Sequence, residues 1–153
     1  IGRTLEWLEI CEVVNPHDHR YPFRTTVLRG QMVDQRFERG GPGPVYEAFD
    51  YLTPLNGGSG FSWRGEERLA HVGRTRLHQF DRLMTAPEML HTISMEADQT
   101  IIMLDQYGDV LPVDVPTSTW VMKGHPKPDT SGLYSKFTES EFMDRLVWLK
   151  GVI

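Results

Sequence analysis

Short apolar segments separated by glycine, proline and polar residues run along most of the chain, and few of them repeat at helical spacing. Segments of this length, rich in β-branched and aromatic residues and bounded by turn formers, are typical of β-strands. Clusters of glycine and proline at 39–44 and 54–60 predict loops. The pattern predicts about eight strands, over residues 5–14, 24–38 with a break at Gly30, 45–52, 68–72, 74–84, 90–95, 99–106 and 118–122.

The end of the chain has a different pattern, "TESEFMDRLVWLKG". Thr138 and Glu141 have the spacing of a capping box, in which each side chain bonds the backbone N–H of the other residue. Apolar residues follow at helical spacing, namely Phe142, Leu146 and Leu149. We therefore expect one helix over about 138–150 that packs one face on a sheet.

Many short antiparallel strands followed by one helix predict an all-β fold, either a jelly-roll type of β-barrel or an immunoglobulin-like sandwich. We favour the barrel, built from about residues 5–122. A chain of 153 residues is the size of one ordinary domain, so we expect a single domain over 1–153.

The composition excludes several classes of function. The 16 Lys and Arg against 21 Asp and Glu leave a net charge of −5 without a basic cluster, so we expect no nucleic-acid partner. The single Cys11 cannot form an internal disulfide, and no apolar run reaches the length of about 20 residues that a membrane span needs. Because the first residues do not resemble a signal peptide, we expect a cytoplasmic protein with no membrane partner.

Three histidines are candidate metal ligands. In "NPHDHRYPF", His17 and His19 would share one face of an extended segment, about 7 Å apart, while Asp18 points away. Two such imidazoles can close on one ion, because each needs a metal–nitrogen distance of about 2 Å; the alternative is a surface loop with two solvated histidines. His91 lies in the apolar run "MLHTISM", where it is either a third ligand or a core histidine held by a hydrogen bond.

The run "HDHRYPFRTTVLRG", followed at a distance by "TAPEMLHTISM", resembles the two metal-binding motifs of the cupin superfamily. This resemblance implies a cupin-type jelly-roll barrel with a metal held by His17, His19 and His91. Cupins commonly add a glutamate shortly after the histidine pair, where this chain has Phe23 and Arg24. A three-histidine site without the glutamate is similar to that of cysteine dioxygenase and the related thiol dioxygenases.

The resemblance covers about residues 15–107 and has clear departures. Tyr107 stands where those enzymes have a catalytic tyrosine, but Met103 and Asp105 replace the residues that support it, and the cysteine that cross-links to it in some members has no counterpart. The resemblance therefore implies the fold and the metal more strongly than the substrate. It also implies a homodimer, since many cupins pair through their strands.

Such a site predicts Fe(II) as the cofactor, with Zn, Ni, Mn or Cu as alternatives. Three neutral ligands leave positions open for a small chelating substrate, such as a thiol, carboxylate or enol, beside O2. The expected function is a mononuclear non-haem Fe(II) dioxygenase. Two alternatives stay open: a non-catalytic cupin that binds a small molecule, and a metal-dependent isomerase or lyase.

Arginine can form two parallel hydrogen bonds with a carboxylate, so arginines near the metal ligands are candidate substrate-binding residues. We single out Arg24, Arg76 and His78 for substrate binding and Tyr107 for catalysis. If the face of the strand carrying Arg76 and His78 points to solvent, these two residues are instead part of an ordinary charged surface. Four further side chains are expected to be structural or exposed: Cys11 buried in a strand, Trp63 in a loop, His71 structural and His125 exposed.

Overall fold

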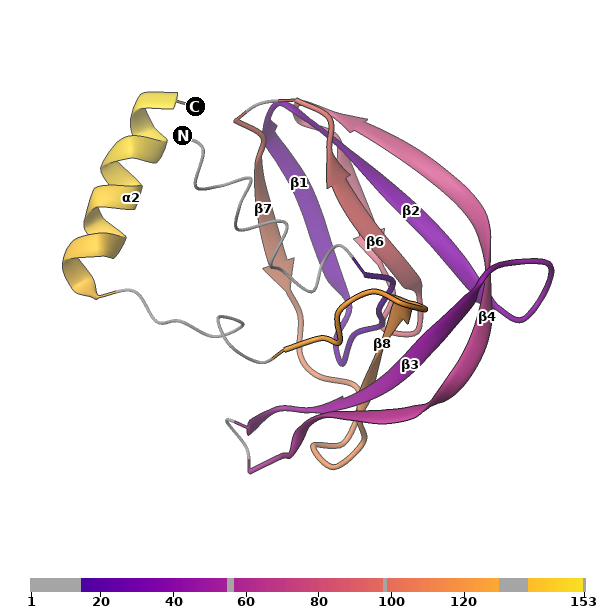
Figure 1. Ribbon diagram of the computed structural model, residues 1–153. Helices are drawn as coiled ribbons and strands as arrows, with labels where there is room; N and C mark the ends of the chain where they lie inside the picture. Colours follow the sequence, from indigo (N-terminus) through magenta and orange to yellow (C-terminus); the bar gives the residue numbers. More distant parts are fainter. Residues whose placement is uncertain (1–14, 55–56, 98, 130–137, 153) are drawn as a thin grey trace.

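The computed structural model describes residues 15–54, 57–97, 99–129 and 138–152 (Figure 1). The described residues are mostly β-strand, with one helix near the C-terminal end of the chain. The elements are β1 (Phe23–Arg29), β2 (Gln31–Arg39), β3 (Val45–Leu52), β4 (Gly60–His78), β5 (Arg82–Thr85), β6 (Leu90–Met95), β7 (Ile101–Gln106), β8 (Thr117–Met122) and α2 (Glu139–Val152). The strand prediction is confirmed for most of these ranges, and the predicted strand over 5–14 lies outside the described residues.

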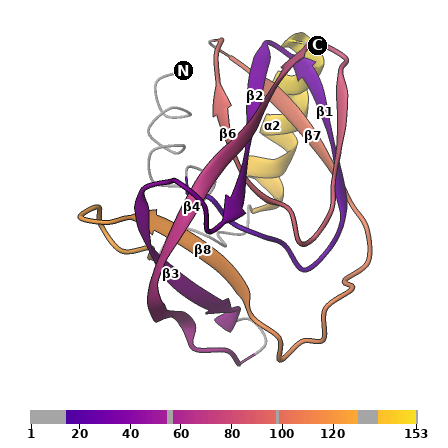
Figure 2. The same ribbon diagram turned by 90° about the vertical axis from the view of Figure 1, so that its right-hand side faces the viewer.

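The strands form two antiparallel sheets that pack face to face (Figures 1 and 2). One sheet has three strands in the order β5-β1-β7, and the other has five strands in the order β6-β2-β4-β3-β8. An apolar cluster is formed by Val27, Met32 and Leu77, with Leu83, Ile93 and Ile102 packed against it. Because these residues come from both sheets, the cluster is the core between them.

Gly30 makes the turn that passes the chain from one sheet to the other. Its φ is +80°, a conformation that side-chain-bearing residues rarely adopt. A Cβ at this position would also lie 2.5 Å from the hydroxyl oxygen of Thr100. The predicted break at Gly30 is confirmed, and it separates β1 in the small sheet from β2 in the large one.

β4 is longer than the sequence pattern predicts. It runs as one strand from Gly60 to His78, because it pairs with β3 along its first half and with β2 along its second half. The chain then turns at Phe80, where φ is +71°, and β5 begins at Arg82. Two predicted features are therefore wrong: 68–72 and 74–84 are not two strands, and Trp63 lies in β4, 58% exposed, rather than in a loop.

A short extended segment joins the two edges of the five-stranded sheet. His17 exchanges backbone hydrogen bonds with His91 in β6, at 3.0 and 3.1 Å. On its other side, Asp18 N–H donates to the Ser118 carbonyl at 3.1 Å, and Trp120 N–H in β8 donates to the Pro16 carbonyl at 2.8 Å. Residues 16–18 therefore close the curled sheet into a hydrogen-bonded ring, and they carry His17 between its two edge strands.

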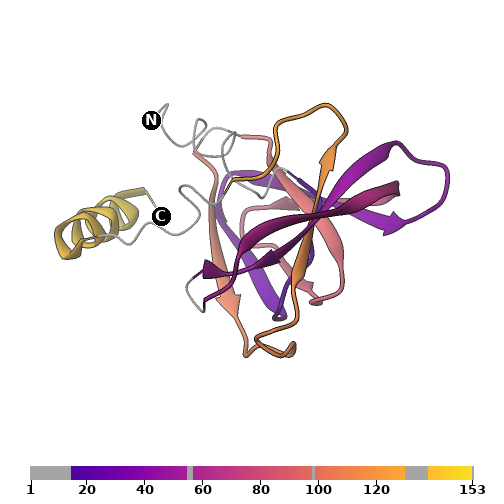
Figure 3. The ribbon, with the colours of Figure 1, turned by 60° about the horizontal axis from the view of Figure 1, so that its bottom comes forward.

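α2 begins with the predicted capping box but does not pack as predicted. Thr138 N–H donates to the Glu141 carboxylate at 2.8 Å, and Glu141 N–H donates to the Thr138 hydroxyl at 3.3 Å. The helix stands apart from the two sheets (Figure 3), and five of its apolar side chains are 36–68% exposed. The exposed residues Phe142, Met143, Leu146, Val147 and Trp148 surround more than one face of the helix, so the sequence provides no single stripe to bury.

Candidate metal centre

The three predicted ligands, His17, His19 and His91, come together in the fold. The first and the last are 74 positions apart in the chain. One ring nitrogen from each histidine lies within 4.8 Å of the others. The Nε2 atoms of His19 and His91 are 2.9 Å apart, and two nitrogen ligands of one metal ion are typically about 3.0–3.4 Å apart for bonds of about 2.1 Å. The prediction that the three histidines meet is confirmed.

The two-residue period of an extended chain explains why both members of the His-x-His pair face the cluster. His17 lies opposite His91 and Thr119, and residues directly opposite one another in antiparallel strands share a face of the sheet. His19 is held one step further along, by its N–H donating to the Pro87 carbonyl at 2.9 Å. The "TAPE" turn that precedes His91 in the sequence therefore also fixes the backbone of His19.

Hydrogen bonds on the far side of two rings leave the inner nitrogens ready to bind a metal. Nδ1 of His17 lies 2.8 Å from the Asn15 carbonyl oxygen, and Nδ1 of His91 lies 2.6 Å from a carboxylate oxygen of Asp34. Both partners are acceptors, so Nδ1 carries the proton in each ring and donates it. The Nε2 lone pairs of His17 and His91 are then free for a metal ion.

Burial keeps the imidazoles of His17 and His19 neutral at physiological pH. Desolvation, with a smaller contribution from His91, lowers the pKa of His17 to about 4. Desolvation and the two neighbouring histidines lower the pKa of His19 to about 2. A histidine must be neutral to bind a metal, so His17 and His19 provide nitrogen ligands that do not first have to lose a charge.

Asp34 supports His91 from behind, and sequence reasoning missed it. Its side chain is fully buried in β2 and accepts hydrogen bonds from His91 Nδ1 at 2.6 Å and from Arg36 Nε at 3.1 Å. Although burial opposes it, these two hydrogen bonds lower the pKa of the Asp34 carboxyl group. A carboxylate that orients a metal-binding histidine and makes it more basic is a common arrangement at metal sites.

A signal for Asp34 was present in the sequence. Met32, Asp34 and Arg36 alternate along β2, and aspartate is depleted in strand interiors. An acidic residue on the same face as a core methionine needs a buried partner. What the sequence could not show is that this partner is His91, because β6 pairs with β2 only in the fold.

Aromatic rings lie beside the cluster, and a buried hydroxyl lies opposite one of them on the small sheet. The rings of Phe23 and Tyr21 lie 4.6 and 5.8 Å from the His19 ring. Thr85 lies directly opposite Phe23 and therefore faces the same side of its sheet. The Thr85 side chain is buried, and its hydroxyl has no hydrogen-bond partner among the described residues. Aromatic rings thus line one side of the histidines, and the strand beside Phe23 carries a buried hydroxyl without a partner among the described residues.

Arg24 and Tyr107 lie near one end of the small sheet, Arg24 in its central strand and Tyr107 just after β7. Arg24 neighbours Phe23 in β1 and so points to the opposite face, where its guanidinium binds the Asp105 carboxylate at 2.7 and 3.0 Å. This hydrogen bond raises the pKa of Arg24. Tyr107 follows β7 and is 46% exposed. Their roles in substrate binding and catalysis stay predictions.

Arg76 and His78 point to solvent on either side of the buried Leu77. Arg76 donates to the Glu96 carboxylate at 2.8 Å, and its side chain is 52% exposed. His78 is also exposed, at the end of β4. These positions agree with the alternative in which this face of the strand is a charged surface, and the substrate-binding role of the two residues stays a prediction.

Two further histidines lie elsewhere. His71 is exposed on β4, with its ring 5.5 Å from that of Phe37. His125 is exposed in the loop after β8, as expected. Cys11 lies outside the described residues.

The chain matches no known protein family, no curated protein and no solved structure. In the part of the chain that the structure describes, no helix is both long and apolar enough to span a membrane. The three histidines can hold one metal ion, and their donor set of neutral nitrogens suits Fe, Zn, Cu, Ni or Co better than Mg or Ca, which prefer oxygen ligands.

Proposed function

We propose that the protein is a small cupin-like metalloenzyme, a mononuclear non-haem Fe(II) dioxygenase that acts on a small chelating substrate. The observation that carries this proposal is the cluster of three histidines with ligand nitrogens within 4.8 Å of one another. Three histidine ligands would leave coordination positions of a bound ion open for a substrate and for O2. Bound Fe(II) would supply activation of O2 and Lewis-acid binding of the substrate.

The residues around the histidines have separate tasks in this proposal. Asp34 holds His91 in one orientation, and Arg36 in turn holds Asp34. Phe23 and Tyr21 form an aromatic wall beside His19, which excludes water from the reacting groups. The unpartnered hydroxyl of Thr85 provides one hydrogen bond for a polar atom of the substrate.

An anionic substrate fits this site because its ligands carry no charge. A divalent ion held by three neutral imidazoles keeps its full charge of +2, so a thiolate, enolate or carboxylate binds more strongly than at a site that already contains a carboxylate ligand. The apolar surroundings strengthen this attraction further.

Oxygen uptake tests the proposal. The protein is loaded anaerobically with Fe(II) and mixed with O2 and a panel of small thiols, 2-oxo acids and enols, beside a His19→Ala variant and a Zn(II)-loaded sample. We expect one member of the panel to drive O2 consumption in the Fe(II) sample only. Conversion of a substrate by the Zn(II) sample without O2 would instead support the isomerase or lyase. If the Fe(II) sample binds iron but consumes no O2 with any of these compounds, the proposed dioxygenase activity is contradicted.

A further inference from the structure

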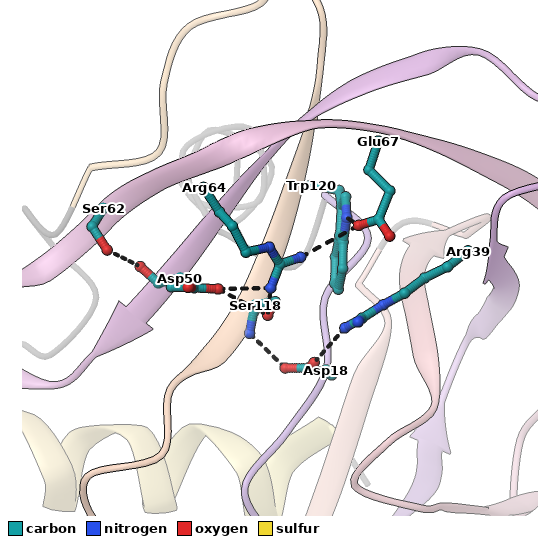
Figure 4. Close-up of polar contacts among 8 residues, drawn as sticks. All are labelled: Asp18, Arg39, Asp50, Ser62, Arg64, Glu67, Ser118 and Trp120. Atoms are coloured by element: carbon teal, nitrogen blue, oxygen red, sulfur yellow. Dashed lines mark hydrogen bonds and ion pairs between the residues drawn. The ribbon is translucent and has the colours of Figure 1, made fainter.

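A hollow opens on the face of the five-stranded sheet opposite to the histidines. It has a volume of about 390 Å3 and is lined by Arg39, Ala48, Arg64, Gly65, Glu66 and Glu67. His17 lies opposite Thr119 and shares its face. The side chains of the neighbours on each strand, Asp18 and Ser118, therefore point to the other face, where Figure 4 shows them beside Arg64.

Small residues form the floor of the hollow. Ala48 in β3 lies directly opposite Gly65 in β4. A Cβ built on Gly65 would meet no atom within 4 Å, so the space above this pair is open. The neighbouring Trp120 is fully buried, and the guanidinium carbons of Arg39 and Arg64 lie over its ring at 4.9 and 5.4 Å from the centroid. Stacking on an indole restricts both guanidinium groups before any ligand binds.

Arg64 makes three hydrogen bonds within the described part of the protein. Its guanidinium donates to the Asp50 carboxylate at 2.7 Å and to the Ser118 hydroxyl at 2.9 Å. It also donates to the Glu67 carboxylate at 3.3 Å, which in turn accepts a hydrogen bond from the Trp120 indole N–H at 2.7 Å. Arg64 therefore builds the wall of the hollow and has its charge neutralised there (Figure 4).

Arg39 differs from Arg64 because its guanidinium makes no hydrogen bond to the described residues. Its closest charged partner is Asp18, at 3.7 Å, beyond hydrogen-bond distance. Asp18 already accepts a 2.6 Å hydrogen bond from the Ser118 N–H. Among the described residues, no hydrogen bond occupies the guanidinium of Arg39, whose side chain is half exposed beside the hollow. The N–H groups of the Arg39 guanidinium are thus available to a ligand in the hollow.

The charges around the hollow favour a singly charged anion over a more highly charged one. The two negative charges of Asp50 and Glu67 exceed the one positive charge of Arg64. The charge of Asp18 offsets that of Arg39, and the Glu66 carboxylate pairs with Lys123 at 2.7 Å. A phosphate, with a charge between −1 and −2, would be repelled by these carboxylates more strongly than a single carboxylate group would. A carboxylate also matches the planar fork of a guanidinium, with two parallel hydrogen bonds.

We propose that this hollow is a second ligand site, which binds a small monocarboxylate through the guanidinium of Arg39. The carboxylate group of the ligand pairs with Arg39 above Trp120, and its body lies over Ala48 and Gly65. The site is independent of the metal, since its residues lie on the other face of the sheet. It is therefore a separate site whether or not the histidines hold an ion.

The indole N–H resonance of Trp120 reports on this site directly, because its donor bonds Glu67 in the wall of the hollow. The full chain, labelled with 15N, is titrated with propionate at constant ionic strength, with sodium chloride replaced stepwise. We expect a saturable shift of the Trp120 resonance, with binding at least tenfold weaker in Arg39→Gln. Arg68→Gln is the matched control, because Arg68 is exposed on the same sheet and donates to the Gly43 carbonyl outside the hollow. It should bind propionate as the wild type does.

Three results would overturn the proposal. The first is a shift that never saturates or that is equal in Arg39→Gln, which would mean that the hollow does not hold the carboxylate. The second is inorganic phosphate binding more tightly than propionate, which would contradict the ligand class. The third is saturation that appears only after Co(II) is added, which would place propionate on the metal; equal binding with and without Co(II) supports the separate site.

Discussion

At the scale of single residues, the best-defined arrangement is the chain of contacts from Arg36 through Asp34 to His91. Asp34 is the fully buried link between a guanidinium and an imidazole. It fixes which nitrogen of His91 carries the proton, and so directs the lone pair of Nε2 toward the other two histidines.

Replacing Asp34 should therefore weaken metal binding although Asp34 is not itself a ligand. We expect Asp34→Asn to lower the affinity for Zn(II) or Co(II) by about 10–100-fold, measured by competition with a coloured chelator. Asp50→Asn is the control, because Asp50 pairs with Arg64 on the other face of the sheet. Equal affinities of Asp34→Asn and the wild type would contradict the role of Asp34.

The hydroxyl of Thr85 gives a second prediction at this scale. A buried hydroxyl without a partner costs about 1–3 kcal/mol, so Thr85→Val should leave the free energy of unfolding unchanged or raise it in the absence of a ligand. Ser118→Ala should instead lower it by about 1 kcal/mol, because the Ser118 hydroxyl bonds Arg64. Urea unfolding measures both changes, and a loss of stability in Thr85→Val would show that the hydroxyl is bonded within the folded chain.

At the scale of elements, turns and register decide which side chains meet. The turn at Gly30 sends β1 and β2 into different sheets, and Phe23 in β1 and Asp34 in β2 then approach the histidines from opposite sides. The segment 16–18 closes the ring of the large sheet and places His17 on one face and Asp18 on the other.

Gly30→Ala should destabilise the fold more than an ordinary turn substitution. Its φ of +80° and the 2.5 Å approach of a Cβ to the Thr100 hydroxyl each oppose a side chain there, and the left-handed conformation alone costs a non-glycine residue about 1 kcal/mol or more. Gly108→Ala is the control, because a Cβ at Gly108 would meet no atom within 4 Å. Equal midpoints of urea unfolding for the two variants would contradict the strain at Gly30.

Most strand positions could be predicted from the sequence because glycine, proline and the apolar runs mark them locally. The ranges 45–52 and 90–95 agree with β3 and β6 to the residue. The length of β4 could not be predicted, because it depends on pairing with two different partners in its two halves. The cluster of His17, His19 and His91 followed from spacing and family resemblance, whereas Asp34 and the hollow at Arg39 depend on tertiary contacts that no local pattern encodes.

At the scale of the whole molecule, the sheets and the helix are separate in their packing. The apolar side chains of α2 are largely exposed, whereas both core clusters are built from strands. The metal centre likewise draws all its ligands and its supporting carboxylate from the sheets and the segment that closes them.

Removing α2 should therefore leave the sheets and the site intact. We expect the chain ended after residue 137 to unfold within a few degrees of the full chain, and to bind Zn(II) with unchanged affinity. Calorimetry and chelator competition make the two comparisons. A fall of about 10 °C or more in the unfolding temperature, which is well over 1 kcal/mol for a protein of this size, would mean that α2 packs on the sheets in solution.

If His17, His19 and His91 form one metal site, the purified protein should bind one metal ion per chain, and its metal content measures this. Protein purified without a histidine tag is loaded anaerobically with Fe(II), freed of unbound metal and measured by elemental mass spectrometry, beside His91→Ala and His125→Ala. The exposed His125 is the control for nonspecific binding. We predict one metal ion per chain in the wild type and in His125→Ala, and almost none in His91→Ala. Equal metal content in all three proteins, or no metal in any of them, would contradict the site.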